Sequence, residues 1–333
     1  MKALILAAGF GTRMVPITET IPKPLIPVVN VPVIEYNIHL LKYHGIKEIF
    51  INLHHNGSKI SKVLGTGKKY GVKIRYLHEE EILGTGGAIG SLKGLVEEPF
   101  VVINSDTIFD FDFDEMVNSH FCSGRKVTLG VIPSSSKDSR AVLTVDEKNV
   151  VVRMLESSIY TTVPEGNAIF TGIHIIDPSV LEYIPDDVFV SITNYVYQRM
   201  VEGGDSINAF IINGKWWDMG TPDDYIECSF ELLKLLPFKY FDPFEKYKLK
   251  PDVYDNSSLV IMGDQVKMHA IPLVPPLILG NGVDLNNLEQ AGPNLIAGDK
   301  VKLKEKNDSA NVIYFSNSDG SRVLFGKKGK IFY

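Results

Sequence analysis

The chain has 333 residues, of which 44% are hydrophobic and 22% are charged, and its formal net charge is −6. This length is enough for one large domain and a smaller one, and an acidic average gives no support for a nucleic-acid-binding protein. No apolar run approaches the roughly 18 residues of a membrane-spanning helix, so we expect no membrane partner.

The amino-terminal apolar run ends at Gly9, which favours a buried first strand over a signal peptide. Cys122 and Cys228 have neither metal-binding nor redox spacing, which favours buried thiols in a reducing compartment. We therefore expect a cytoplasmic protein.

Short apolar runs alternate with helical patterns in the first part of the chain. Helices are predicted around residues 33–41, where Gly45 ends the pattern, and around 88–95. Near-continuous apolar strands separated by helices are typical of a parallel sheet covered on both faces. The pattern predicts a Rossmann-like α/β fold, a mostly parallel sheet sandwiched by helices. The predicted strands in this part are 3–6, 49–53, 72–77 and 100–103.

Beyond residue 125 the apolar runs become longer and partly alternating. Strands are predicted at 150–155 and 169–176, and helices at 192–201 and 222–236. We place the first domain at residues 1–236. The segment from Pro237 to Pro251 has no period, and we interpret residues 237–258 as a connector.

A repeat of 17 and 18 residues marks the tail, residues 259–333. Gly263, Gly280 and Gly298 each precede a valine by three positions. Such a period indicates a solenoid and resembles one coil of a left-handed β-helix made of hexapeptide repeats, although irregular β-turns are the alternative. Because a short solenoid leaves an open end, we expect this domain to support a homo-oligomer.

A glycine-rich loop, L-A-A-G-F-G-T-R, follows the first strand directly. Glycines let backbone N–H groups approach phosphate oxygens closely. The dinucleotide fingerprint needs a small residue where Met14 stands, and a P-loop needs Gly-Lys-Ser/Thr, which is absent. Arg13 ends the loop, and Lys23 follows between Pro22 and Pro24. Two cations near such a loop suit a triphosphate.

The two segments L-A-A-G-F-G-T-R-M and P-K-P-L-I-P-V together resemble the signature of the sugar-1-phosphate nucleotidyltransferase family. The resemblance covers about residues 1 to 235, and some family members also have a carboxy-terminal left-handed β-helix. It implies an enzyme that joins a nucleoside triphosphate to a sugar 1-phosphate and releases pyrophosphate. Arg13 and Lys23 would contact the triphosphate and the departing pyrophosphate. The resemblance also implies nucleotide contacts at Leu6, Ala8, Gly9, Gly11 and Thr12.

Two acidic positions predict a metal site. Asp106 follows the buried strand 100–103, where open α/β sheets bind ligands, and its carboxylate suits Mg²⁺. The resemblance makes Asp218, in W-D-M-G-T-P, the second ligand. The run D-F-D-F-D at 110–114 is typical of metal-dependent glycosyltransferases, but we prefer the interpretation that Asp112 or Asp114 caps the following helix.

The resemblance places nucleobase recognition in E-E-E-I-L-G-T-G-G, at Glu79, Gly84 and Thr85. Guanine presents two adjacent donors, which one carboxylate accepts together. The run resembles that of guanylyltransferases for mannose 1-phosphate and heptose 1-phosphate. We therefore predict GTP and mannose 1-phosphate as substrates. The alternatives are a uridylyl- or thymidylyltransferase for glucose 1-phosphate, with this run a solvated strand end.

The resemblance assigns the sugar pocket to Glu156, Asn167 and Gly172, beside Thr171. Two departures from the family pattern affect this pocket. Ser157 stands where a lysine normally holds the sugar phosphate, and Arg140-Ala141 replaces the usual Tyr-Gly. Arg140 and Lys215 are candidates to restore the missing charge. These departures leave open a regulatory relative that binds nucleotide-sugars without making them.

Overall fold

The computed structural model describes residues 1–15, 17–134, 143–154, 166–186, 188–235 and 239, and in the tail 260–262, 265–267, 277–279, 283–284, 295–297, 312–316, 322–326 and 330–332. The chain folds into two compact units. The first contains residues 1–9 and 37–216, and the second contains residues 10–36 and 217–333. Apart from Lys239, the predicted connector 237–258 lies outside the described residues, so the predicted domain boundaries stay predictions.

The described part of the first unit is built on a nine-stranded sheet with the order β5-β4-β1-β6-β11-β8-β12-β10-β9. Its strands are β1 (Ala3–Leu6), β4 (Glu48–Leu53), β5 (Lys73–His78), β6 (Phe100–Asn104), β8 (Val127–Pro133), β9 (Leu143–Val145), β10 (Val150–Met154), β11 (Ala168–Ile176) and β12 (Ile207–Ile211). The shorter β7 (Thr107–Asp110) follows β6.

The sheet is mixed, which corrects the prediction of a mostly parallel one. Strands β5, β4, β1 and β6 are parallel, as predicted, but β11 runs antiparallel to both β6 and β8. Strand β10 is likewise antiparallel to β12 and β9. The longer, partly alternating runs beyond residue 125 were the sequence signal of this change, because antiparallel strands need no helical crossover.

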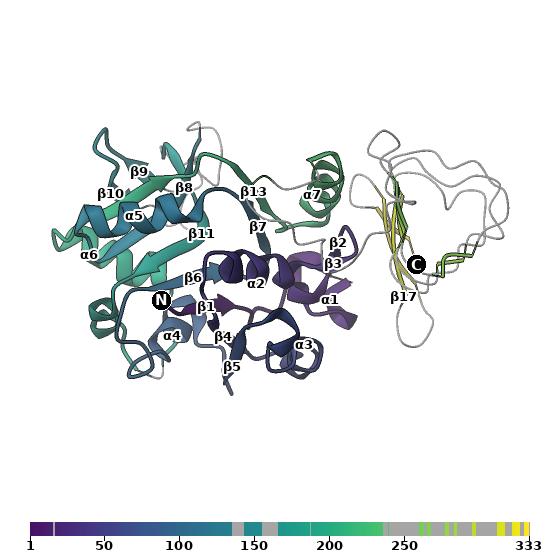
Figure 1. Ribbon diagram of the computed structural model, residues 1–333, viewed down its shortest axis with the longest axis horizontal. Coiled ribbons are helices and arrows are strands. Elements are labelled where there is room, and N and C mark those ends of the chain that lie inside the picture. Colours follow the sequence, from purple (N-terminus) through teal and green to yellow (C-terminus); the bar gives the residue numbers. More distant parts are fainter. Residues whose placement is uncertain are drawn as a thin grey trace. The chain divides into compact units, whose positions relative to one another are not determined.

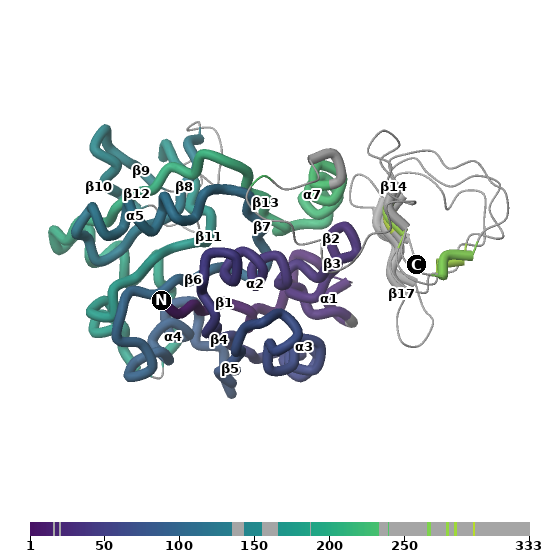
Figure 2. Tube along the Cα trace, viewed as in Figure 1, coloured from purple at the N-terminus to yellow at the C-terminus, as the bar shows by residue number. Residues whose placement is uncertain are grey.

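Strand β1 lies in the middle of the parallel part, between β4 and β6 (Figure 2). Ala3, Leu4 and Ile5 are at most 1% exposed, as expected for a strand covered on both faces. The register aligns Leu6 with Asn52 of β4 and with Asn104 of β6. The three strands therefore end at one edge of the sheet, where their following loops meet.

Helix α5 packs against β8 and β12 and lies on the near side of the sheet in Figure 1. Asp112 caps α5, as predicted, because its side chain accepts from the backbone N–H groups of Asp114 and Glu115. The segment predicted as a helix at 192–201 begins as a π-helix. The helices of this unit are α3 (Gly57–Leu64), η3 (Lys68–Tyr70), α4 (Gly84–Gly90), α5 (Phe113–Ser123), η4 (Pro178–Tyr183), η5 (Ile192–Tyr197) and α6 (Gln198–Glu202), while α2 (Val33–Tyr43) begins in the second unit.

The second unit combines residues 10–36 with the chain from Trp217 onward. The Tyr225 hydroxyl donates to Pro27 O at 2.7 Å, and Trp217 Nε1 donates to Glu231 Oε2 at 2.8 Å. Its elements before the tail are η1 (Thr12–Met14), α1 (Ile17–Thr20), η2 (Lys23–Leu25), β2 (Pro27–Val28), β3 (Val31–Pro32) and α7 (Pro222–Leu235), and β13 (Lys215–Asp218) leads into it from the first unit.

The spacing of the tail strands along the chain matches the predicted repeat of 17 and 18 residues. Neighbouring strands pair in parallel with their partners 17 or 18 residues apart in the chain, in the order β14 (Val260–Met262), β15 (Leu277–Leu279), β16 (Leu295–Ala297) and β17 (Val312–Ser316). Val283 of the second repeat is fully buried. Strands β18 (Arg322–Gly326) and β19 (Lys330–Phe332) continue the sheet antiparallel, which the repeat did not predict. Winding of the chain as a left-handed β-helix stays a prediction.

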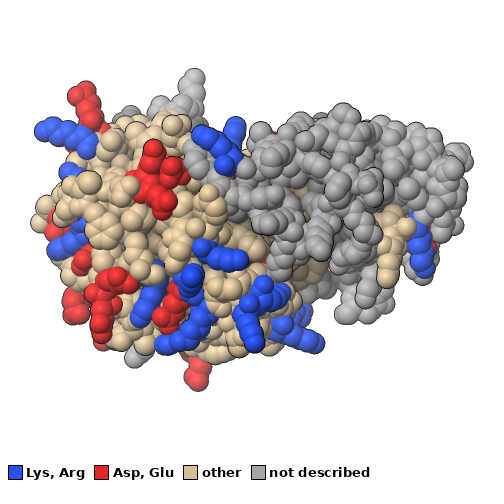
Figure 3. All heavy atoms as spheres, viewed as in Figure 1, with Lys and Arg blue, Asp and Glu red and all other residues tan. Residues whose placement is uncertain are grey.

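Both signs of charge appear among the described side chains on the face shown in Figure 3. Within the described residues, no helix combines the length and apolar character that a membrane span requires.

Candidate functional site

The predicted phosphate-binding loop begins at the edge where β1 ends. Ala8 is buried, whereas Gly9, Thr12 and Arg13 are exposed. Gly11 has φ +66°, and a Cβ there would lie 2.8 Å from Thr18 Cγ2 and 3.2 Å from Lys23 Cβ. A side chain at Gly11 would be both strained and obstructed, so glycine keeps this turn tight.

The second unit holds three predicted residues, one beside this turn and two beside Gly220. Lys23 opens the short helix η2 between Pro22 and Pro24, and its Cβ packs beside Gly11. A Cβ on Gly220 would lie 3.0 Å from Arg13 Nη1 and 3.3 Å from Asp218 Oδ2. Arg13 and Asp218 therefore flank Gly220. Lys23 Cβ thus lies beside the turn that leads to Arg13, while the pairing of their two charges on one triphosphate stays a prediction.

The motif residues after Asp218 form the start of α7. Thr221 Oγ1 donates to Asp224 Oδ2 at 2.7 Å, and the Asp224 N–H donates back to Thr221 Oγ1 at 3.3 Å. Pro222 occupies the first helical position, which needs no N–H donor. The G-T-P part of the motif thus fixes the helix start and, with it, the chain direction at Asp218.

Asp106 lies half-buried in the turn between β6 and β7. The neighbouring Asn104 O accepts from Asn37 Nδ2 at 2.9 Å and from Thr107 Oγ1 at 3.1 Å, which holds this turn in place. Asp106 and Asp218 belong to different units, so their sharing of one metal ion stays a prediction. Among the described residues there is no group of three or more His, Cys, Asp or Glu that could hold a metal. Carboxylate oxygens suit Mg²⁺, which typically takes one or two protein carboxylates plus phosphates.

Glu79 is buried, at 8% exposure, whereas Glu80 and Glu81 are exposed. Asn52 Nδ2 donates to Glu79 Oε1 at 2.7 Å, and the Leu83 N–H donates to Glu79 Oε2 at 3.1 Å. Sequence reasoning missed Asn52. The available signal was an amide interrupting the apolar run of β4 just before its end.

Gly84 and Thr85 lie at the start of α4, which begins four residues earlier than predicted. Thr85 Oγ1 accepts from the Ile192 N–H at 2.9 Å, and the Gly86 N–H donates to Val190 O at 2.7 Å. A Cβ on Gly84 would lie 2.6 Å from Val190 O. Part of the glycine requirement in this run therefore comes from packing against the segment at Val190.

Of the predicted sugar-binding residues, Asn167 and Gly172 lie in described segments, whereas Glu156 does not. Ser157, in place of the family lysine, and Arg140, a candidate replacement for its charge, also lie outside the described residues. The side-chain amide of Asn167 makes two hydrogen bonds to the backbone of Val145, at 2.9 and 2.8 Å. Gly172 lies in β11 with φ +84°.

Trp216 Nε1 donates to Thr171 O at 3.0 Å. This bond fixes the backbone immediately before Gly172, and sequence reasoning did not identify Trp216 as a support of the predicted sugar segment.

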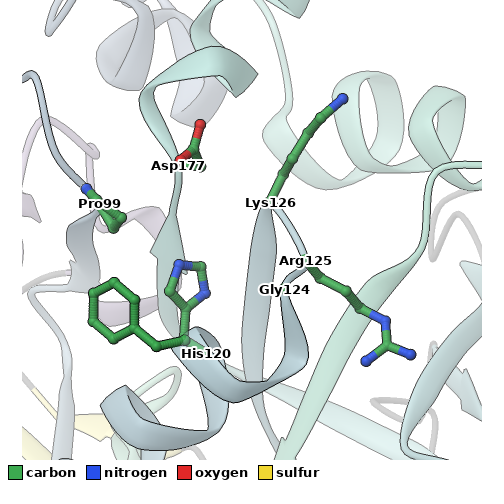
Figure 4. A pocket seen from close by; sticks show the side chains of 7 residues that line it. Pro99, His120, Gly124, Arg125, Lys126 and Asp177 are labelled. Atoms are coloured by element: carbon green, nitrogen blue, oxygen red, sulfur yellow. The ribbon is translucent and has the colours of Figure 1, made fainter.

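A separate cavity of about 290 Å³ lies at the opposite edge of the sheet (Figure 4). Pro99 precedes β6, Lys126 precedes β8 and Asp177 follows β11, so the cavity is at the other end of β6 from Asp106. The Lys126 ammonium points away from the cavity and donates to Tyr183 Oη at 3.0 Å. None of the predicted site residues lines this cavity.

Residues 2–234 match the family model described as nucleotidyl transferase. Among curated proteins, the chain is 33% identical over 241 residues to a UTP–glucose-1-phosphate uridylyltransferase from Synechocystis, covering 68% of this chain and 61% of that protein. It is 31% identical over 275 residues to a mannose-1-phosphate guanyltransferase from Debaryomyces hansenii, covering 81% and 73%.

Solved structures show the same fold over 69% of the chain. A putative glucose-1-phosphate thymidylyltransferase from Bacillus anthracis, in complex with a sucrose, matches with a TM-score of 0.62 and 25% identity, covering 69% of this chain and 94% of that one. HddC from Yersinia pseudotuberculosis, complexed with GMP-PN, matches with a TM-score of 0.59 and 24% identity, covering 69% and 99%. The chain therefore belongs to the sugar-1-phosphate nucleotidyltransferase family, as its paired motifs predicted.

Proposed function

We propose that this protein transfers a nucleotidyl group from a nucleoside triphosphate to a sugar 1-phosphate, giving a nucleotide-sugar and pyrophosphate. The observation that supports this most directly is the placement of Lys23 Cβ beside the turn at Gly11 and of Arg13 and Asp218 on either side of Gly220. Family membership over residues 2–234 supports the same reaction.

The reaction asks little acid or base chemistry of the protein. A sugar phosphate is already ionised at pH 7, and one of its oxygens attacks the α-phosphorus. The bond from that phosphorus to the oxygen bridging to the β-phosphorus breaks, and pyrophosphate leaves with the electron pair. Arg13 and Lys23 supply positive charge toward the leaving group. Positioning and charge neutralisation therefore account for most of the required rate enhancement.

Two carboxylates would hold the metal ion. Asp106 and Asp218 offer the hard oxygen ligands that Mg²⁺ prefers, and Mg²⁺ when bound would neutralise phosphate charge. Neither residue needs to act as a base, since the nucleophile is ionised. The other roles proposed for this chain are nucleotide contact at Leu6, Ala8, Gly9, Gly11 and Thr12, base-side contact along Gly84 and Thr85, and sugar contact at Glu156, Asn167 and Gly172.

For substrates we propose GTP and mannose 1-phosphate. The run E-E-E-I-L-G-T-G-G supports this choice, as does similarity to the Debaryomyces hansenii guanyltransferase. The similarity to a Synechocystis uridylyltransferase supports the alternative, UTP or dTTP with glucose 1-phosphate. The absence of the family lysine, at Ser157, keeps a non-catalytic nucleotide-sugar-binding protein as a second candidate function.

The test follows pyrophosphate release from each nucleoside triphosphate with Mg²⁺ and a panel of sugar 1-phosphates. We expect turnover, with GTP preferred over UTP and dTTP by on the order of 100-fold in kcat/KM. Lys23→Met should lower kcat/KM on the order of 100-fold, because a cation that faces the leaving group is lost. Lys62→Met is the matched control, since Lys62 lies exposed on α3, and its kcat/KM should be unchanged.

Turnover of UTP or dTTP equal to that of GTP would refute the guanine choice. Binding of nucleotide-sugar without any pyrophosphate release would favour the non-catalytic candidate.

A further inference from the structure

The side chains of Asn52 and Glu79 connect three chain segments at the edge of the sheet. The Ala7 N–H donates to Asn52 Oδ1 at 2.8 Å, and Asn52 Nδ2 donates to Glu79 Oε1 at 2.7 Å. The Leu83 N–H, immediately before α4, donates to Glu79 Oε2 at 3.1 Å. Ala7 directly precedes Ala8 and Gly9 of the phosphate-binding loop. These hydrogen bonds therefore link that loop to Leu83, the residue immediately before Gly84 and Thr85.

Because Asn52 and Glu79 are buried, their polar atoms need hydrogen-bond partners within the protein. Asn52 is 4% exposed and Glu79 is 8% exposed, and the four bonded residues all lie in the first unit. A buried amide or carboxylate without partners destabilises a fold, but in each of these three hydrogen bonds a donor faces an acceptor. Each residue type is thus specified by its neighbours. Asn52 must accept from Ala7 and donate to Glu79, while Glu79 must accept from both sides.

Direct recognition of guanine would require both Glu79 oxygens to face the base. One oxygen already accepts from Asn52 and the other from Leu83, and the side chain is more than nine-tenths buried. Glu80 and Glu81, the other acidic members of the same run, are exposed. The carboxylate of Glu79 is therefore used within the protein.

We infer that Glu79 and Asn52 are positioning residues, which hold the phosphate-binding loop and the start of α4 at a fixed spacing so that both contact one nucleotide. This inference rests on the proposed function, because that function makes these two segments the nucleotide site. Under this inference, Glu79 does not contact the base. It aligns the two segments that contact the nucleotide.

Exchanging the two side-chain types provides the test. In Glu79→Gln the new amide can accept from Leu83, but its NH₂ group then faces the NH₂ group of Asn52. In Asn52→Asp the new carboxylate accepts from Ala7, but its other oxygen faces the carboxylate of Glu79. The double variant Asn52→Asp/Glu79→Gln lets every donor face an acceptor again, with the same net charge and nearly the same volume.

The four proteins are compared by KM for GTP and for UTP, KM for the sugar phosphate, kcat and the urea midpoint. Each single variant should raise KM for both nucleotides on the order of 10-fold. The double variant should return both values to within about threefold of the wild type. KM for the sugar phosphate should change less than twofold in all variants. A general structural defect would instead be expected to raise KM for both substrates.

Asn208→Asp is the matched control. Asn208 is also buried, and its amide donates to Ser119 Oγ of α5 at 3.0 Å. It lies on β12, opposite Thr128 near the start of β8. This variant should lower the urea midpoint without changing the nucleotide KM.

Two results would overturn the inference. One is a double variant no better than the single variants. The other is loss of GTP use alone, with UTP use normal, which would return Glu79 to direct recognition of guanine.

Nucleotide Kd, measured by calorimetry without sugar phosphate, separates this inference from the proposed function. A wild type that binds nucleotide but releases no pyrophosphate would refute the proposed transferase activity. The positioning role would still be tested, because the double variant should restore the nucleotide Kd that each single variant weakens. A wild type that binds no nucleotide would refute both.

Discussion

Gly172 of β11 occupies a position that only glycine fits without cost. Its φ is +84°, a conformation that residues with a side chain rarely adopt. A Cβ there would contact Asn104 Nδ2 and would lie 2.8 Å from Asn104 Cγ and 3.2 Å from Asn104 Cβ. Asn104 ends β6, two residues before Asp106. Gly172→Ala therefore tests a link between the predicted sugar segment and the turn that bears a predicted metal ligand.

Two effects add in this variant. The left-handed backbone costs about 1–2 kcal/mol for a residue with a Cβ. Displacing a packed neighbour costs about 1–3 kcal/mol more, because Asn104 is held by hydrogen bonds from Asn37 and Thr107 to its carbonyl oxygen. The free energy of unfolding should therefore fall by about 2–5 kcal/mol in total.

Gly204→Ala separates the two effects. Gly204 has nearly the same φ, +89°, and nothing lies within 4 Å of a Cβ built there. Urea unfolding, followed by circular dichroism, should show a loss of only about 1–2 kcal/mol for this control. Combining Gly172→Ala with Asn104→Ala should remove most of the excess, since the displaced side chain is then absent.

Equal destabilisation by Gly172→Ala and Gly204→Ala would refute this reasoning, since the contact with Asn104 would then cost nothing. An excess that persists in the double variant would also contradict it.

Three further predictions concern the metal, the tail and acid stability. Asp106→Asn and Asp218→Asn should each abolish most turnover while leaving the circular dichroism spectrum unchanged, and near-normal activity in both would remove the metal assignment. Deleting residues 259 to 333 should lower the oligomeric state measured by light scattering, and an assembly state unaffected by the deletion would count against an assembly role. Burial lowers the pKa of His174 to about 3, and this ring bonds Tyr197 Oη at 2.5 Å. Because the unfolded chain takes up a proton near pH 6.5 that the folded chain refuses, stability is full above that pH and falls by about 1.4 kcal/mol per unit toward pH 3. In His174→Gln the slope of unfolding free energy against pH should fall by about 1.4 kcal/mol per pH unit, the contribution of one proton. An unchanged slope would refute the assignment of this pH dependence to His174.

The sequence by itself determined the local structure and the chemistry of the motifs. The apolar runs at 3–6 and 100–103 were enough to locate β1 and β6, since a strand buried on both faces must be apolar throughout. Asp112 was recognisable as a helix cap because capping depends only on neighbouring backbone N–H groups. The paired motifs around Arg13 and Lys23 identified the family because each is a contiguous run of residues that can be recognised without knowing the fold.

Only the tertiary structure decided which distant groups meet. Strand direction in β8 and β11 depends on pairing partners far away in sequence, so the mixed sheet was not predictable from local pattern. The role of Glu79 depends on Asn52, which lies 27 residues away, and a lone carboxylate in an acidic run has the same sequence signal whether it is buried or solvated. The placement of Arg13 beside Gly220 likewise required folding, because contacts between segments remote in sequence leave no local pattern to detect.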